Sequence, residues 1–239
     1  MGESRTNKSI KNIATGIIYK LVGIFLPFLI RTVMIKKLGA EYLGLSSLFT
    51  SILQVLSLSE LGIGNAMVYS MYKPMAENDT DRICALLTLY RKFYSIIGSV
   101  ILILGMLLAP FLKYFISGTY PSDINIYVLY FIYLFNTVIS YFLFAYKKSI
   151  LDAMQKVSIE NTIQTAVTAS MYILQIIVIC ITKNYYAYII LLPFSTLIIN
   201  VFRNAIIKKK YPEFVCRGTV EKEFVLELYK KIRALIGHK

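Results

Sequence analysis

Three ionisable side chains stand inside long apolar stretches of the sequence, and they are its strongest chemical signal. Lys20 and Arg31 fall in the first of these stretches, and Glu60 falls in the second, just before Gly62 and Gly64. A charge inside an apolar membrane span is costly and usually marks a ligand path or a gating contact. The sequence therefore predicts a transport-type site built on cations. The carboxylate beside two helix-weakening glycines predicts a hinge, with an ordinary bend at the membrane surface as the alternative.

Helical spacing places the two cations on one face of the first stretch. At 100° per residue, Lys20 and Arg31 lie with three small or kinking residues inside a sector of roughly 80°, and the two cations are about 16 Å apart along the helix axis. The same face carries Gly16, Gly23 and Pro27. Lys20 would lie near the bilayer middle, which favours a functional cation, with a structural pairing to Glu60 or to water as the alternative. Arg31 is nearer the outer end, where it could also extend to the interface beside Lys36 and Lys37.

Polar side chains line one face in three other apolar stretches. The longest stripe comprises Asn161, Gln164, Thr165, Thr168, Tyr172 and Gln175. Two shorter stripes comprise Thr50, Gln54 and Ser57, and Tyr133, Asn136, Thr137 and Ser140. Such groups can simply join helices, for about 1 kcal/mol each, and for the last stripe this alternative is equally good. Six polar positions exceed what a helix contact needs, so the longest stripe is predicted to line a wet cavity. The predicted cavity set is Lys20, Arg31, Thr50, Gln54, Asn161, Gln164, Thr165, Thr168 and Gln175.

The elements that must hold these residues are membrane spans. Hydrophobic residues make up 57% of the chain and charged residues only 16%, against about 25% in soluble domains. A span needs about 20 apolar residues, and six stretches qualify. They run over about 10–34, 43–71, 93–115, 124–146, 159–181 and 185–207. The sequence therefore predicts an all-α polytopic membrane protein, with one six-helix bundle over residues 1–210.

The charges outside the spans predict how this bundle is oriented. Most of the 26 Lys and Arg residues fall on the side that also receives the N-terminus, which places both termini in the cytoplasm. This clustering accounts for the net charge of +13, so no nucleic-acid partner is predicted. Residues 211–239 follow Lys208–Lys210 as a cytoplasmic linker. Within it, residues 220–236 have the spacing of an amphipathic helix at the inner interface.

Several kinds of enzyme chemistry lack their residues. The single histidine is His238, and the three cysteines are widely spaced, which supports neither a metal site nor a disulfide framework. No P-loop motif is present. Carboxylates within the spans are essentially Glu60, with Glu160 at a boundary, so a paired-carboxylate hydrolase is not supported. We therefore expect no enzyme activity, no cofactor and no metal.

The first two spans and the loop after them resemble a known protein family. The segments that carry the resemblance are Arg31–Gly44, Leu58–Ala66 and Tyr72–Arg82. In helix order and loop character, essentially the whole chain is similar to the N-terminal half of bacterial O-antigen or capsule repeat-unit flippases. These form the polysaccharide-transporter branch of the multidrug/oligosaccharidyl-lipid/polysaccharide exporter superfamily. The resemblance implies one of two six-helix bundles in a V-shaped exporter of the bacterial plasma membrane.

The resemblance also implies an activity and partners. Such proteins move an undecaprenyl-diphosphate-linked oligosaccharide across the membrane by alternating access, usually coupled to an ion gradient or the membrane potential. Arg31 matches a cavity-facing arginine, and Glu60 matches the acidic position before the glycines. The expected partners are the lipid-linked oligosaccharide, membrane lipids, and a second six-helix half or other polysaccharide-assembly proteins. Without that half, the chain is expected not to flip lipid. A related multidrug-type exporter and a non-transport membrane protein of polysaccharide assembly are the alternatives.

Overall fold

A computed structural model describes residues 5–57, 63–116, 118–226 and 228 of the chain. Over these residues the protein is helical with connecting loops, and no strand occurs. Four helical segments are long and apolar enough to cross a membrane. They are α1 (Arg5–Lys37), α4 (Thr80–Leu108) continued through η2 (Ala109–Phe111) and α5 (Leu112–Phe115), α8 (Val157–Thr182), and α9 (Tyr185–Ile189) with α10 (Leu191–Lys210). The predicted all-helical fold is confirmed, and several apolar helices agree with a membrane protein.

A fifth candidate span is bent. It consists of α6 (Ile126–Phe142) and the segment formed by η3 (Ala145–Lys147) and α7 (Lys148–Ala153), with a bend of 50° between them. The predicted span at 124–146 is therefore an α-helix only up to Phe142. Its continuation changes direction and carries Lys147, Lys148 and Asp152.

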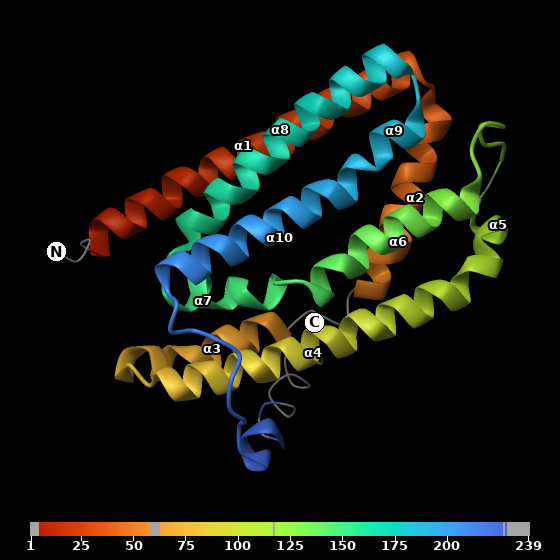
Figure 1. Cartoon of the computed structure of the whole chain (residues 1–239). Coiled ribbons are helices and arrows are strands. Elements are labelled where there is room, and N and C mark those ends of the chain that lie inside the picture. Colours follow the sequence, from red (N-terminus) through yellow and green to blue (C-terminus); the bar gives the residue numbers. More distant parts are fainter. Residues whose placement is uncertain (1–4, 58–62, 117, 227, 229–239) are drawn as a thin grey trace.

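The predicted span at 43–71 is not a single helix among the described residues. α2 (Ala40–Leu56) has 17 residues, slightly fewer than the roughly 20 that a span needs. The chain is next described as α3 (Ile63–Glu77), which packs against α4 and α7. Together α2 and α3 lead from the α1–α2 turn to the opposite end of the molecule (Figure 1). By length and composition, four or five spans are found among the described residues, and the sixth stays a prediction.

The third predicted span begins earlier than hydropathy indicates. α4 starts at Thr80, whereas the sequence predicts a span from residue 93 after a polar loop. The side chain of Asp79 caps the helix by accepting a hydrogen bond from the amide of Arg82 at 2.9 Å. Apolar residues then recur at helical spacing, and Ile83, Leu86, Leu87 and Tyr90 are buried. The polar residues between them hide this amphipathic start from a hydropathy scan.

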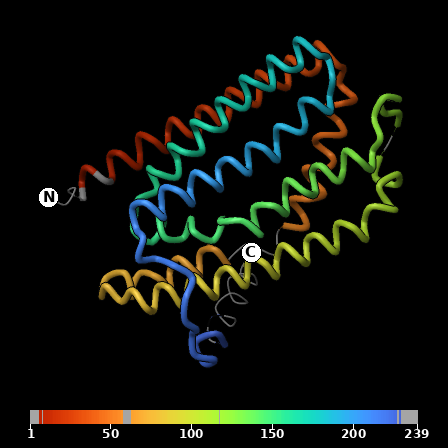
Figure 2. Tube along the Cα trace, viewed as in Figure 1, coloured from red at the N-terminus to blue at the C-terminus, as the bar shows by residue number. Residues whose placement is uncertain are grey.

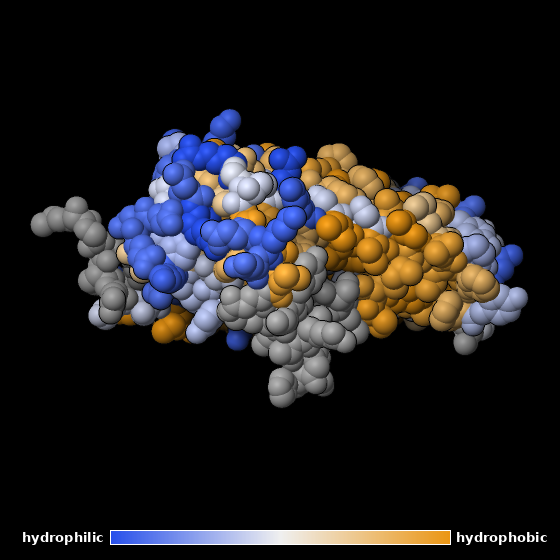
Figure 3. Space-filling model, turned by 90° about the horizontal axis from the view of Figure 1, so that it is seen from below, coloured by the Kyte–Doolittle hydropathy of each residue, from blue (hydrophilic) through white to orange (hydrophobic). Residues whose placement is uncertain are grey.

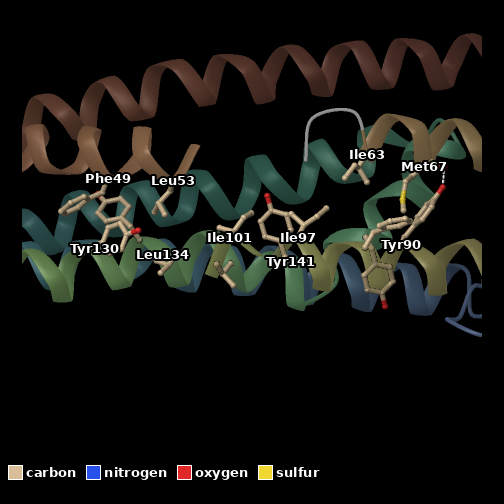
Figure 4. Close-up of a cluster of buried hydrophobic side chains, with 14 of the residues drawn as sticks. Phe49, Leu53, Ile63, Met67, Tyr90, Ile97, Ile101, Tyr130, Leu134 and Tyr141 are labelled. Atoms are coloured by element: carbon tan, nitrogen blue, oxygen red, sulfur yellow. Dashed lines mark hydrogen bonds between the residues drawn. The ribbon is translucent and has the colours of Figure 1, made fainter. Parts of the chain in front are cut away.

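The helices form layers that Figures 1 and 2 show edge-on. α1 and α8 lie side by side as an outer pair, α10 lies next to α8, and α6 and α4 follow. Asn12 joins the outer pair, since its amide donates to the carbonyl of Gln155 at 2.9 Å and accepts from the amide of Ser158 at 2.8 Å. The buried apolar core runs between α2, α3, α4 and α6 as an elongated string of side chains (Figure 4).

The surface agrees with a membrane location. In Figure 3 an apolar band lies beside a hydrophilic end of the molecule. The segment after α10 crosses α4 (Figure 1). Arg217 contacts Asp81 at 2.8 Å, and Arg82 contacts Glu221 at 3.4 Å. Of the predicted amphipathic helix at 220–236, residues 222–226 are helical and the ring of Phe224 packs under Arg82. Its remainder lies almost wholly outside the described residues.

Close packing of α4 on α6 depends on Gly98, and this gives a first prediction. A Cβ atom at Gly98 would lie 2.8 Å from the Cβ of Tyr141, which is part of the facing helix and cannot swing away. We expect Gly98→Leu to destabilise the protein by about 1–3 kcal/mol, the usual cost of overpacking. Thermal unfolding in detergent micelles measures this. Gly23→Leu on α1 is the control, because nothing lies within 4 Å of its added Cβ. Equal stability of the two variants would contradict the α4–α6 packing.

Candidate functional site

A polar cavity of about 340 Å³ lies between α1, α2 and the facing parts of α6, α8, α9 and α10. We call it the Arg31 cavity. Its walls are formed by Pro27, Ile30, Arg31, Met34, Leu43, Ser46, Ser47, Thr50, Ser51, Gln54, Tyr133, Tyr172, Tyr188 and Leu192. Three residues of the predicted cavity set, Arg31, Thr50 and Gln54, therefore line one site.

Two local features bring these residues together. Gly39 adopts φ 126°, which a side chain would disfavour, and this turn folds α2 back against the end of α1. On α2, Ser47, Thr50, Ser51 and Gln54 then follow one another at helical spacing and share one face. All four are exposed at the rim, so the cavity opens at the surface beside α1 and α2.

The charge in this cavity is positive and uncompensated. Within the part of the chain that the structure describes, no ion pair involves Arg31, and the walls contain no carboxylate. Arg31 is close enough to act electrostatically on the phenols of Tyr172 and Tyr188. The cavity is therefore suited to an anionic or hydroxyl-rich group.

Tyrosines close the cavity toward the α1–α2 turn. The hydroxyl of Tyr133 is hydrogen-bonded to Ser46 and lies 3.3 Å from the hydroxyl of Tyr185. Tyr185 in turn packs on Tyr42, with ring centroids 5.1 Å apart. The hydroxyl of Tyr42 donates to Asp123 at 2.7 Å, which attaches α2 to the loop before α6.

A second cavity, of about 320 Å³, shares α6, α8 and α10 with the first, and we call it the Arg203 cavity. It is bordered by α4, α6, α7, α8 and α10. Its walls are formed by Tyr94, Ser140, Tyr141, Ala145, Lys148, Gln164, Thr196, Ile199, Asn200 and Arg203. The two cavities have no lining residue in common.

The Arg203 cavity is centred on a buried ion pair. Glu160 is 2% exposed and Arg203 is 4% exposed. Arg203 Nε donates to Glu160 Oε2 at 2.8 Å, and Arg203 Nη2 donates to the other oxygen, so the contact is bidentate. Arg203 Nη1 donates to Asn200 Oδ1 at 2.8 Å, and the amide of Gln164 donates to Glu160 at 3.1 Å. Both oxygens of Glu160 and all three nitrogens of the Arg203 guanidinium group therefore have a hydrogen-bond partner.

Sequence reasoning missed this pair. Glu160 was expected at a span boundary and Arg203 among the cytoplasmic cations. One signal could have found it. Thr196, Asn200 and Arg203 lie at i, i+4 and i+7, which makes a polar face on the last span. Glu160 and Gln164 likewise share a face at i and i+4.

The remaining residues of the predicted cavity set do not line the Arg31 cavity. Lys20 is exposed on α1 and lines neither cavity. Asn161 faces Gly16 in the α1–α8 contact, with 3.6 Å between its amide nitrogen and an added Cβ. Gln175 is buried, and its amide lies 3.5 Å from the carbonyl of Tyr188. Of the α8 residues in the predicted cavity set, only Gln164 lines the Arg203 cavity.

The stripe divides because α8 has neighbours on two sides. α1 covers one side and α10 the other, so side chains a few residues apart meet different partners. Thr165 and Thr168 are half-buried and line neither cavity. Neither of the two cavities extends along the whole stripe, so the predicted wet cavity along this helix stays a prediction.

The predicted hinge lies mostly outside the described residues, which include neither Glu60 nor Gly62. Gly64 is the second residue of α3, and an added Cβ there would lie 3.9 Å from the hydroxyl of Tyr94. Among the described residues, no group of three or more His, Cys, Asp or Glu side chains could hold a metal ion.

The fold and the two cavities define an all-helical protein with several candidate membrane spans and polar sites between them. No protein-family model, curated protein or solved structure matches this chain.

Proposed function

We propose that the chain is one six-helix half of a flippase for lipid-linked oligosaccharides in the bacterial plasma membrane. In this proposal the Arg31 cavity receives the diphosphate and the adjoining sugar. The observation that carries it is the guanidinium of Arg31, which has no ion pair among the described residues and faces a cavity without carboxylates. By the charge distribution of the loops, both termini lie in the cytoplasm.

The cavity walls supply the chemistry that such a ligand needs. A guanidinium presents parallel N–H donors that match a phosphate group. Ser46, Ser47, Thr50 and Ser51 add hydroxyls, and Gln54 adds an amide, all of which suit a polyhydroxyl ligand. Exposed apolar side chains on these helices, such as Ile24 and Phe28 on α1 and Val55 on α2, would keep the lipid tail of the ligand in the bilayer.

The exposed polar face of α1 and α2 supports a second bundle as the partner. Lys20 on α1 and Thr50 and Gln54 on α2 are exposed, although both helices also expose large apolar side chains. Polar and charged groups in contact with lipid are costly, so a covering element or water must face them. A second six-helix half would enclose this face and complete a central cavity.

The Arg31 cavity argues against the multidrug-type alternative. A cationic drug would meet the like charge of Arg31 and would find no carboxylate in the walls. A phosphate group would be attracted by the charge of Arg31 and would meet no repelling carboxylate in the walls that the described residues form.

A binding experiment tests the proposed function. We expect the chain in nanodiscs of zwitterionic lipid to bind a sugar-linked short-chain prenyl diphosphate at least about tenfold more tightly than the matching prenyl alcohol. The physical reason is the charge-assisted contact with Arg31, which contributes about 1.5–3 kcal/mol. A cationic amphiphile of the same chain length is the comparison for the multidrug alternative. Equal affinity for diphosphate and alcohol, or preference for the cation, would contradict the proposal.

A cellular measurement tests the role of the second half. In cells that lack their repeat-unit flippase, we expect residues 1–239 alone not to restore export. Restored export would show that one bundle suffices.

A further inference from the structure

We propose that the Arg203 cavity is a second anion site, which opens when Glu160 takes up a proton, so that a proton and a phosphate- or sulfate-class anion bind together. The site is distinct from the Arg31 cavity, because the two have no lining residue in common. The proposal therefore does not depend on the proposed function.

The geometry of the ion pair provides the first step. Arg203 holds the two oxygens of Glu160 through Nε and Nη2, which is also how a guanidinium holds two oxygens of a tetrahedral oxyanion. Glu160 thus occupies the place that an anion would take. The adjoining space of about 320 Å³ is bordered by Arg203 itself. An incoming anion has room beside the donors that it needs.

The charge balance provides the second step. While Glu160 is ionised, the pair is neutral, and a further anion would add an uncompensated charge to a site in which both partners are buried. Once Glu160 is protonated, Arg203 becomes a buried cation without a counter-ion, which is unfavourable by several kcal/mol. An anion removes that penalty. By thermodynamic linkage, anion binding then favours protonation of Glu160, and protonation favours the anion to the same extent.

The surrounding groups favour this exchange. From α7, Lys148 acts on Glu160 and borders the same cavity, so its ammonium would attract the anion. Lys148 is only loosely held, because its Nζ lies 3.6 Å from Asp152 and its side chain is 52% exposed. The carboxylate of Asp152 would repel the anion, and the nearby ammonium of Lys148 would offset this repulsion. From α4 and α6 the facing titratable groups are the phenols of Tyr94 and Tyr141.

Among the described residues, the other neighbours of α8 form no ion pair with Glu160. α1 meets this end of α8 with the uncharged Asn12 and Gly16, and its Lys11 is exposed. α9 follows the opposite end of α8. Among the described residues, Arg203, Lys148 and Asp152 are therefore the charges that determine whether an anion can replace Glu160 at the guanidinium group of Arg203.

Sulfate binding measured by calorimetry tests the proposal. Sulfate is a suitable probe because it does not change its own protonation between pH 5 and pH 8. The protein carries Arg31→Gln, so that only the Arg203 cavity is titrated, in nanodiscs of zwitterionic lipid. We expect one sulfate to bind, with an affinity that falls by up to about tenfold for each pH unit, as linkage to one proton requires. Adding Glu160→Gln is expected to make the binding independent of pH, and adding Arg203→Gln to abolish it.

Three results would overturn the proposal. They are no sulfate binding at any pH in this range, the same pH dependence with Glu160→Gln, and undiminished binding with Arg203→Gln. Should Glu160→Gln not fold, proton uptake by the protein with Glu160 intact decides the matter. Calorimetry in two buffers of different ionisation enthalpy is expected to give up to one proton taken up per sulfate, and no uptake at any pH in this range would refute the proposal.

Discussion

Replacing Arg31 by Gln is expected to weaken the binding of a sugar-linked prenyl diphosphate by roughly 10- to 150-fold. The loss corresponds to about 1.5–3 kcal/mol for a hydrogen bond to a charged group, at 1.4 kcal/mol for each factor of ten. The reason is that, among the residues that the structure describes, Arg31 is the one cation in the walls of its cavity. Arg31→Lys keeps the charge but loses the paired donors, so an intermediate affinity is expected. Equilibrium binding in nanodiscs measures all three proteins.

Lys20 provides the matched control for this prediction. Both side chains are exposed and lie on the same face of α1 by helical spacing, but Lys20 borders neither cavity. We expect Lys20→Gln to change the affinity by less than about twofold, since distant exposed charges are largely screened. Equal losses for Lys20→Gln and Arg31→Gln would place the ligand along the outside of α1 and contradict binding in the cavity.

Breaking the buried pair from one side is expected to be the most destabilising single change. Arg203→Met leaves Glu160 as a buried carboxylate without its counter-ion, at a cost of about 3–5 kcal/mol. Glu160→Leu leaves Arg203 unpaired and is expected to cost a similar amount. The free energy of unfolding in detergent micelles, from denaturant titration, measures both.

The double variant Glu160→Leu with Arg203→Met is expected to regain most of the lost stability, because neither charge remains buried alone. The exposed pair between Lys73 and Glu77 is the control. It spans 3.9 Å with side chains 83% and 57% exposed, so Lys73→Met is expected to cost less than about 1 kcal/mol. Additive losses in the double variant would show that the contact between Glu160 and Arg203 does not couple the two residues.

The sequence predicted the long helices well, because a run of about 20 apolar residues has few alternative structures. The fifth predicted span, 159–181, corresponds to α8 within about two residues at each end. Hydropathy was misleading where apolar and polar residues alternate at helical spacing. It missed the first part of α4, which is amphipathic and capped by Asp79. It also gave one span over 43–71, where α2 and α3 are described on either side of residues 58–62.

The candidate site could be predicted only where local geometry determines it. Arg31, Thr50 and Gln54 come together because a short turn joins their helices. The polar faces of α1 and α2 and the glycine of the turn are therefore enough to predict that these residues lie close together. Glu160 and Arg203 are 43 residues apart, and their contact depends on how α8 and α10 pack. A helical wheel gives the direction of a side chain but not the helix that faces it, which is why Lys20 could not be distinguished from Arg31.

The pairing of α1 with α8 has a consequence for biosynthesis. α1 packs mainly against α8, which begins at Val157, roughly 120 residues after α1 ends at Lys37. At about 5–20 residues per second, the ribosome needs roughly 6–24 s to reach that point. During this time the newly made α1, with Asn12 and Gly16 not yet covered by α8, must wait in the lipid or beside the insertion machinery. Any factor that shelters this first helix would therefore set the yield of folded protein.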